Sequence, residues 1–439
     1  MASSPKVAIL GLNEASRNII PLFQFFGFRV TCVWDRNTSR AKDQCAKNGI
    51  RLAEFWEQFP TKWEDVLVSP HVEVVYVATA PSQHAEIAVK ALSMGRHVVC
   101  QSPLAASMAG AGKMISMSRW YPKLFGGLGS HFRFLPAVRK MKELIDEGYC
   151  GRVMMVEARI NSTSLLVDDT YDWKCDSAAG GGALNILGSH LVDLVMHLTD
   201  GKVIEASGFL KTFYEETDTI KNYRKITGDD YCSAQLRCRN GISASVTVNC
   251  TWPKGFQFCL SVTGRKGQLC VRDMDLYSQR PGEEEVEVYK EPISVSPNDD
   301  ESENSAGVGS HNYLDFFKLG CQYMLPWLLS TLHMSSSNSD MLVEEPETHS
   351  LSGPMLSFEE GFEVQKVLST IRQSHHARKW CAVKDAERDV LEQGDPFWQS
   401  AVKGYDSHMS LDSITVVKPA AVPAKGKRMS RSEQRKPHS

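Results

Sequence analysis

Residues 72–102 read VEVVYVATAPSQHAEIAVKALSMGRHVVCQS, and this stretch decides the fold class. An apolar run is followed, from Pro81, by a segment with helical spacing and then by a second apolar run at 97–101. Two parallel strands need a crossover connection, which is usually a helix. Strands that are apolar throughout are typical of a sheet covered on both faces. The stretch therefore predicts a parallel α/β sheet.

The same alternation extends back to the N-terminus. Strand patterns lie at KVAILGL (6–12) and FRVTCVWD (28–35), with a helical pattern between them and another from Thr38. Apolar strands that alternate with helices predict a doubly wound, Rossmann-type domain.

From Arg152 the pattern changes to longer strand-like runs joined by turns such as Asn240-Gly241. These runs are VMMVEARI (153–160), DYCSAQLRC (230–238), ISASVTVNC (242–250), FQFCLSVTG (256–264) and GQLCVRD (267–273). They predict a mostly antiparallel sheet. One helix is expected within it, from about Ala183 to Leu198, and later helices are expected from His311 and Ser357.

The chain is therefore expected to be α/β plus α+β, with two folded domains. Its 439 residues, 42% of them hydrophobic, supply enough apolar material for two cores. We place a Rossmann dinucleotide-binding domain at 1–126 and an open-faced antiparallel sheet domain with returning helices at 127–385. The remainder, 386–439, is a tail whose last part, from about residue 413, is basic and proline-bearing, and we expect disorder there.

Composition limits the class of partner. A net charge of −3 gives no electrostatic reason to expect nucleic acid or an anionic membrane, so a small-molecule substrate is favoured. Twelve cysteines without a CxxC pair are typical of a reduced, cytoplasmic protein, and no metal site is expected. Glycosylation sequons at Asn37, Asn161 and Asn249 make secretion the alternative location.

The turn GLNEAS (11–16) occupies the position of a G-x-G-x-x-G/A dinucleotide motif. Gly11, Leu12 and Asn13 are expected to meet a pyrophosphate at the start of the following helix. Asn13 and Ser16 replace the second and third small residues. Because asparagine tolerates left-handed dihedrals, we expect the turn to keep its shape with less room for phosphate. The alternative is an ordinary strand-to-helix turn.

Asp35 ends the second predicted strand, where an acid accepts hydrogen bonds from the adenosine ribose. Arg36 beside it can cover the adenine or meet a 2′-phosphate, so NAD and NADP both remain open. The alternative for this segment is a helix cap at Asn37 or Thr38.

Three separate segments carry a resemblance to a known family. They are VEVVYVATAPSQHAEIAVKALSMGRHVVCQSPLA, GSHFRFLPAVRKMKELIDEGYCGRV and GGGALNILGSHLVDLVMHLTDG. They resemble the glucose-fructose oxidoreductase, inositol dehydrogenase and rhizopine-catabolism (Gfo/Idh/MocA) family, over about Lys6 to Trp380. Within it, YPKL and FLKTFYEETDTIKNYRKITGDDYC are most similar to the animal glucose-fructose oxidoreductase domain-containing proteins. The resemblance implies an NAD- or NADP-dependent oxidoreductase of sugars or polyols, with the nicotinamide between the two domains.

The resemblance also implies roles for individual residues. Thr79, Ala80 and Pro81 would line the nicotinamide half of the site, and His84 would brace the loop after the third strand. Gln101, which replaces a family glutamate, would lie near the nicotinamide ribose.

The catalytic positions depart from the family. The family lysine that follows the glutamate is Ser102 here, and the aspartate one turn before His190 is Ile186. His190 could serve as the proton acceptor, because an imidazole titrates near neutral pH. Asp193 could replace the missing carboxylate only if its side chain points the same way.

Arg133 and Trp173 match positions near the substrate entrance. Either substrate contact or bracing of the domain junction would explain them.

Three functions follow from these observations. One is an atypical oxidoreductase in which His190 and Ser102 handle the substrate. A second is a catalytically inactive dinucleotide-binding scaffold or sensor, and the third is a domain that has lost the dinucleotide. We also expect a homo-oligomer through ISASVTVNC and FQFCLSVTG, on the premise that an uncovered sheet exposes apolar surface.

Overall fold

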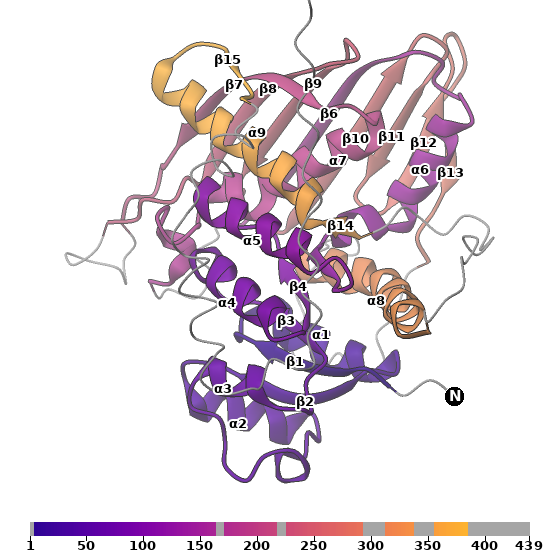
Figure 1. The fold of residues 1–439 in the computed structure, drawn as a ribbon. Coiled ribbons are helices and arrows are strands. Elements are labelled where there is room, and N and C mark those ends of the chain that lie inside the picture. The colour runs from indigo at the N-terminus through magenta and orange to yellow at the C-terminus, as the bar shows by residue number, and fades with distance from the viewer. Residues whose placement is uncertain (1–3, 164–170, 217–224, 293–311, 338–354, 385–439) are drawn as a thin grey trace, which may run out of the picture. The chain divides into compact units, whose positions relative to one another are not determined.

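The computed structural model describes residues 4–163, 171–216, 225–292, 312–337 and 355–384. The predictions for the tail and for a helix start at His311 concern residues outside these ranges. Within them the chain forms two β-sheets with associated helices (Figure 1).

The first sheet has six strands in the order β14-β5-β4-β3-β1-β2. The strands are β1 (Lys6–Leu10), β2 (Arg29–Trp34), β3 (Val74–Val77), β4 (His97–Gln101), β5 (Gly126–Gly129) and β14 (Leu356–Ser357). All neighbours pair in parallel except β14, which joins β5 antiparallel. The predicted parallel Rossmann-type sheet is confirmed.

Helices cover this sheet and connect its strands. They are α1 (Glu14–Phe25), α2 (Thr38–Lys47), η1 (Leu52–Glu54), α3 (Trp63–Val68), α4 (Pro81–Ser93) and α5 (Met108–Trp120). A much later helix, α8 (Tyr313–Ser337), packs against α1. Its buried Phe317, Met324 and Leu328 share one core with Phe23 and Tyr76 of the first sheet region. Among the described residues, no helix combines the length and apolar character needed to cross a membrane.

The second sheet has nine strands in the order β13-β12-β11-β10-β6-β9-β8-β7-β15. They are β6 (Val153–Ser162), β7 (Val203–Lys211), β8 (Tyr231–Cys238), β9 (Ser243–Asn249), β10 (Phe256–Gly264), β11 (Gln268–Arg272), β12 (Asp275–Gln279), β13 (Val286–Tyr289) and β15 (Cys381–Ala382). Neighbours pair antiparallel except β6 and β9, which are parallel. The predicted, mostly antiparallel sheet is confirmed.

Among the described residues, helices contact one face of this sheet and leave the other open (Figure 1). The covering helices are α6 (Pro136–Asp146), α7 (Ser189–Thr199) and α9 (Phe358–Ala377). On β9 the inner side chains, such as Val246, are buried, whereas Ser243, Ser245 and Thr247 face outward. The premise that the open face is mainly apolar is therefore wrong, because polar side chains, small on β9 and charged on β6 at Glu157 and Arg159, cover much of it.

The helix predicted at 183–198 begins as a π-helical turn, η4 (Leu184–Gly188), and continues as α7. The carboxylate of Asp229 accepts the N–H of Leu184 at 2.7 Å and so caps this helix. Three short 3-10 or π turns, η2 (His131–Phe134), η3 (Trp173–Cys175) and η4, lie beside one pocket.

Candidate active site

The pocket lies at the carboxyl ends of the first-sheet strands and has a volume of about 770 Å³. That volume falls in the usual range for cofactor and ligand pockets. One wall comes from the first sheet and includes Leu12, Asp35, Thr79, Ala80, Gln101 and Ser102. The other wall comes from the second domain and includes Ser162, Trp173, Lys174, Ile186, His190 and Phe256.

Gly11 and Asn13 shape the floor of the pocket. Gly11 has a φ of 99°, and a Cβ there would lie 2.7 Å from the backbone of Ala78 and Thr79. Only glycine allows β1 and β3 to approach so closely. Asn13 has a φ of −100°, so the left-handed conformation expected for it is wrong. It is instead the N-cap of α1: its Oδ1 accepts the Ser16 N–H at 2.7 Å, and Ser16 Oγ accepts the Asn13 N–H at 2.9 Å.

The amide of Asn13 also links the floor to β4. Its Nδ2 donates to Ala78 O at 3.1 Å and to Gln101 Oε1 at 2.7 Å. Gln101 in turn donates to the hydroxyl of Tyr76 at 3.3 Å. Asn13 therefore fills part of the space that a second glycine would leave. The hydrogen bonds to Asn13 and Tyr76 hold the Gln101 side chain in one orientation.

Asp35 lies where a ribose would bind. Its Oδ2 accepts the N–H of Leu12 and its Oδ1 accepts the N–H of Asn37, both at 2.9 Å. A carboxylate has further lone pairs for a ligand hydroxyl. Arg36 lines the pocket beside it, and Asn37 caps α2 through the Arg40 N–H, so the helix cap is confirmed and is compatible with a ligand at Asp35.

The loop after β3 supplies the next contacts. Thr79 and Ala80 line the pocket, and Thr79 Oγ1 is buried without a hydrogen-bond partner among the described residues. Buried hydroxyls are usually paired, so this group is suited to a ligand. His84 lies behind the wall, where its ring contacts Thr79 O at 3.0 Å and Pro103 O at 3.1 Å. Pro81 starts α4 behind the pocket surface.

These groups fit a dinucleotide. Asp35 faces the ribose position and Thr79 offers an unpaired hydroxyl. The N–H groups of Glu14 and Ala15 precede the helix's own hydrogen bonds and border the pocket, as a phosphate site requires. Arg17 adds a positive side chain to this border.

Ser102, Ile186 and His190 all line the pocket, as their sequence positions imply. Burial lowers the pKa of His190 to about 4. Its imidazole is therefore neutral at neutral pH and a weak proton acceptor, which argues against the catalytic role expected for it. His131 packs against it with ring centres 4.6 Å apart.

Arg133 is not among the residues that line the pocket in the described ranges, so of the two interpretations left open for it the structure favours bracing. Its guanidinium is buried and donates from Nε to both carboxylate oxygens of Asp193, at 3.0 and 2.9 Å. It also lies 3.4 Å from Glu360 of α9. Asp193 is thus occupied by Arg133 and does not replace the missing aspartate.

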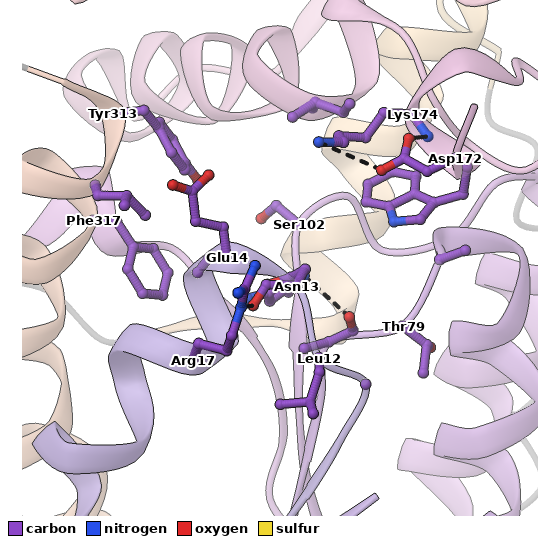
Figure 2. A pocket seen from close by; sticks show the side chains of 18 of the residues that line it. Leu12, Asn13, Glu14, Arg17, Thr79, Ser102, Asp172, Lys174, Tyr313 and Phe317 are labelled. Carbon is purple, nitrogen blue, oxygen red and sulfur yellow. Dashed lines mark hydrogen bonds and ion pairs between the residues drawn. The ribbon is translucent and has the colours of Figure 1, made fainter. Parts of the chain in front are cut away.

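Sequence reasoning missed Lys174 and Asp172, which line the pocket on either side of Trp173. Lys174 Nζ lies 3.4 Å from Asp172 Oδ2, and Figure 2 shows this pair facing the pocket near Ser102. Asp172 Oδ1 also accepts the Lys174 N–H at 2.8 Å, which fixes the start of η3. The sequence YDWK (171–174) offered a signal for them, because a carboxylate and an amine flank Trp173, which the resemblance places near the substrate entrance.

The glycine run packs beneath this turn. A Cβ on Gly181 would overlap the carbonyl oxygens of Trp173 and Lys174. The Gly182 N–H donates to Lys174 O at 3.1 Å. The backbone that carries Lys174 is therefore held rigidly against the start of η4.

Aromatic side chains close the pocket opposite this pair. Figure 2 shows Tyr313 and Phe317 of α8 beside Glu14. No cluster of three or more His, Cys, Asp or Glu side chains that could hold a metal ion occurs in the described ranges.

A Rossmann-type sheet whose strand ends share one pocket with an open-faced antiparallel domain defines a class of two-domain, dinucleotide-binding oxidoreductases. Two family models refine this class. Residues 5–125 match the "Oxidoreductase family, NAD-binding Rossmann fold", and residues 138–270 match the "GFO/IDH/MocA C-terminal domain". The chain belongs to the Gfo/Idh/MocA oxidoreductase family.

Curated relatives support the same conclusion. Glucose-fructose oxidoreductase domain-containing protein 2 of Homo sapiens is 32% identical over 88% of this chain and 94% of its own length. Glucose-fructose oxidoreductase domain-containing protein 1 of Xenopus tropicalis is 32% identical over 86% of this chain and 92% of its own.

Solved structures share the fold. An oxidoreductase domain protein from Kribbella flavida has a TM-score of 0.69 at 22% identity, over 88% of this chain and all of its own. Levoglucosan dehydrogenase in complex with NADH and levoglucosan has a TM-score of 0.67 at 18% identity, over 87% of this chain and all of its own.

Proposed function

We propose that this chain binds NAD(H) in the pocket and interconverts a hydroxyl and a carbonyl group on a sugar- or polyol-like substrate. The observation that carries the proposal is the Lys174–Asp172 ion pair, which lies in the same pocket as the dinucleotide-type groups Asp35 and Thr79. An amine is thus present although Ser102 replaces the family lysine.

The cofactor would be held by groups already described. Asp35 would accept hydrogen bonds from the adenosine ribose, and the start of α1 would face the diphosphate. Thr79 and Ala80 would contact the nicotinamide half. The bound nicotinamide supplies the hydride acceptor or donor for the reaction.

The proton step falls to Lys174. When a substrate carbonyl is reduced, its oxygen must gain a proton, and the Lys174 ammonium within hydrogen-bond reach can donate it. In the reverse direction the amine takes the proton back from the hydroxyl. Asp172 Oδ2, 3.4 Å away, orients Nζ. Trp173 between them would border the substrate.

A second function is favoured by a separate observation. Asn13 already donates to Gln101 at 2.7 Å, so these two polar side chains are satisfied by the protein itself. Together with Ser102 and Ile186, this supports a dinucleotide-binding scaffold or sensor without catalysis.

The test combines calorimetric binding of NADH with turnover of a panel of aldoses, inositols, sugar acids and levoglucosan, the ligand named with one solved neighbour. Lys174→Arg keeps the positive charge but removes the proton acceptor, because arginine stays protonated. We expect turnover to fall about 10²- to 10⁴-fold in this variant while NADH affinity is kept. Lys202→Arg, an exposed lysine outside the pocket lining, is the matched control.

The outcomes separate the alternatives. Absence of NADH and NADPH binding would overturn the proposal as a whole. If Lys174→Arg kept its turnover, Lys174 would not be the group that transfers the proton. Tight binding without turnover of any substrate favours the scaffold.

A further inference from the structure

Three carboxylates line the pocket in the described ranges, those of Glu14, Asp35 and Asp172. Asp35 accepts two backbone N–H groups, and Asp172 forms an ion pair with Lys174. Glu14 is exposed at the start of α1, and within the described part of the chain no hydrogen bond or ion pair engages its carboxylate. Glu14 is therefore the pocket carboxylate that remains available to a ligand.

The hydroxyl of Tyr313 faces this carboxylate. Figure 2 shows the phenol of Tyr313 directed at Glu14, although these two described side chains are not hydrogen-bonded to each other. Burial, followed by the charges of Cys321 and Glu14, raises the pKa of the Tyr313 hydroxyl, so this hydroxyl stays protonated and can donate. A carboxylate and a donor that face each other in an open pocket suit a ligand that carries hydroxyl groups.

The contacts of Tyr313 put this pair near the ends of β4 and β5. The Tyr313 ring lies 5.8 Å from the ring of His131, which comes shortly after β5. β5 pairs with β4 through Gly129 and Gln101. Gln101 is the residue that the family resemblance puts near the nicotinamide ribose, whereas Asp35 lies at the other end of the site, after β2.

Gln101 itself is already occupied. Its Oε1 accepts the amide of Asn13 at 2.7 Å, and its Nε2 donates to the Tyr76 hydroxyl at 3.3 Å. An amide also lacks the charge that makes a carboxylate a strong acceptor for hydroxyl groups. A ribose at this end therefore finds no charged acceptor on β4, and Glu14 is the pocket residue that can supply one.

The negative charge of Glu14 is compatible with a diphosphate at the start of α1. Its side chain turns toward Tyr313. The N-terminus of a helix favours negative charge, and Glu14 is in the first turn of α1. Arg17, also on the pocket border, adds a positive side chain three residues further along the same helix.

We propose that Glu14 and Tyr313 hold the 2′,3′-diol of the nicotinamide ribose, with the carboxylate as acceptor and the phenol as donor. The dinucleotide is then held by one acid at each ribose, Asp35 at the adenosine and Glu14 at the nicotinamide. This inference rests on the proposed function for the presence of the cofactor, but not for any step of catalysis.

Calorimetric titration with three ligands tests the proposal. NADH and ADP-ribose both carry a second ribose, whereas ADP ends at the diphosphate. We expect Glu14→Gln to weaken NADH and ADP-ribose about 5- to 20-fold, because hydrogen bonds to a charged acceptor are lost, and to leave ADP unchanged. Glu64→Gln is the matched control, since it makes the same change in the first turn of α3, outside the pocket lining, and should leave all three affinities unchanged.

Tyr313→Phe tests the donor. The variant keeps the ring that packs against His131 and Phe256 and removes only the hydroxyl. We expect NADH and ADP-ribose to weaken about 3- to 10-fold, again without an effect on ADP. In the double variant with Glu14→Gln, the loss of binding free energy should differ from the sum of the two single losses, because both side chains hold one diol. Near-UV circular dichroism confirms that each variant is folded before it is compared.

The outcomes separate this inference from the proposed function. A wild type that binds none of the three ligands overturns both. A wild type that binds NADH, with equal affinity in Glu14→Gln, overturns this inference alone. Tighter binding of all three ligands in Glu14→Gln overturns it as well, because the carboxylate then repels the diphosphate. Unchanged NADH and ADP-ribose affinity with a raised KM for substrate overturns it in favour of a substrate diol at the same pair.

Discussion

At the scale of single residues, the departures from the family pattern have structural replacements. Asn13 takes a glycine position but caps α1 and bonds to Gln101. Ser102 takes a lysine position, while Lys174 brings an amine into the same pocket from the second domain. An amine therefore lines the pocket although the lysine position of the family holds a serine.

Asp35 gives a test of cofactor choice. Its carboxylate should bind the free 2′-hydroxyl of NAD and repel the 2′-phosphate of NADP. Asp35→Ala should weaken NADH about 10- to 100-fold, the loss expected for hydrogen bonds to a charged group, and weaken NADPH less. Titration calorimetry measures both.

Loss of the Leu12 contact would affect both dinucleotides alike, so the ratio of the two affinities is the informative quantity. Asp43→Ala on α2 removes an exposed charge nearby and should leave that ratio unchanged. An unchanged ratio in Asp35→Ala would contradict the assignment.

At the scale of elements, the rigid contact between the glycine run and η3 positions Lys174. Gly181→Ala would push its Cβ into the Trp173 and Lys174 carbonyls, so the turn must move. Overpacking of this kind costs about 1–3 kcal/mol of folding free energy. We expect a lower urea midpoint and, where the chain turns substrate over, a loss of kcat larger than the loss of NADH affinity.

Gly110→Ala in α5 is the matched control. Its nearest neighbours are the Ala85 Cβ at 3.2 Å and the Ser107 Oγ at 3.3 Å, and alanine favours a helix. If kcat fell equally in Gly181→Ala and Gly110→Ala, the contact between the glycine run and η3 would not be what positions Lys174.

The sequence predicted some helices and strands well and others poorly. Apolar runs predicted the strands of the first sheet, because strand patterns depend on local spacing. The parallel pairing of β6 with β9 and the π turn η4 depend on contacts between distant segments. Lys174 was missed for the same reason, since nothing local to YDWK shows which pocket its side chain enters.

At the scale of the whole molecule, buried neutral histidines predict acid sensitivity. Burial lowers the pKa of His190 to about 4, and burial also lowers the pKa values of His84 and His131. An unfolded histidine titrates near 6.5, so the unfolded chain binds more protons as the pH falls below that value. Stability is therefore lost from about pH 6.5 down to the folded pKa.

For His190 alone the expected loss between pH 7.5 and pH 5.5 is about 1–2 kcal/mol. Urea unfolding at the two pH values measures it, and His190→Asn should show a smaller difference between them than the wild type. An equal difference in both proteins would show that His190 does not contribute.

The open face of the nine-stranded sheet leads to the last prediction, self-association. Its side chains are mostly polar, small on β9 but long and charged at Glu157 and Arg159 of β6, and Met155 and Phe209 are 38% and 53% exposed among them. Contact between two copies of this face would bury these scattered apolar groups inside a mostly polar interface. We expect light scattering at tens of micromolar protein to give a multiple of the chain mass.

Ser245→Arg, on the middle of β9, should return the mass to that of one chain, because unpaired like charges would meet across a two-fold contact. Asp43→Arg on α2 is the matched control and should leave association intact. Cys259 of β10 is exposed on the same face, so its alkylation should slow as the concentration rises in the wild type and not in Ser245→Arg. A single-chain mass for the wild type would contradict association through any face, and a multiple mass that persists in Ser245→Arg would place the contact elsewhere.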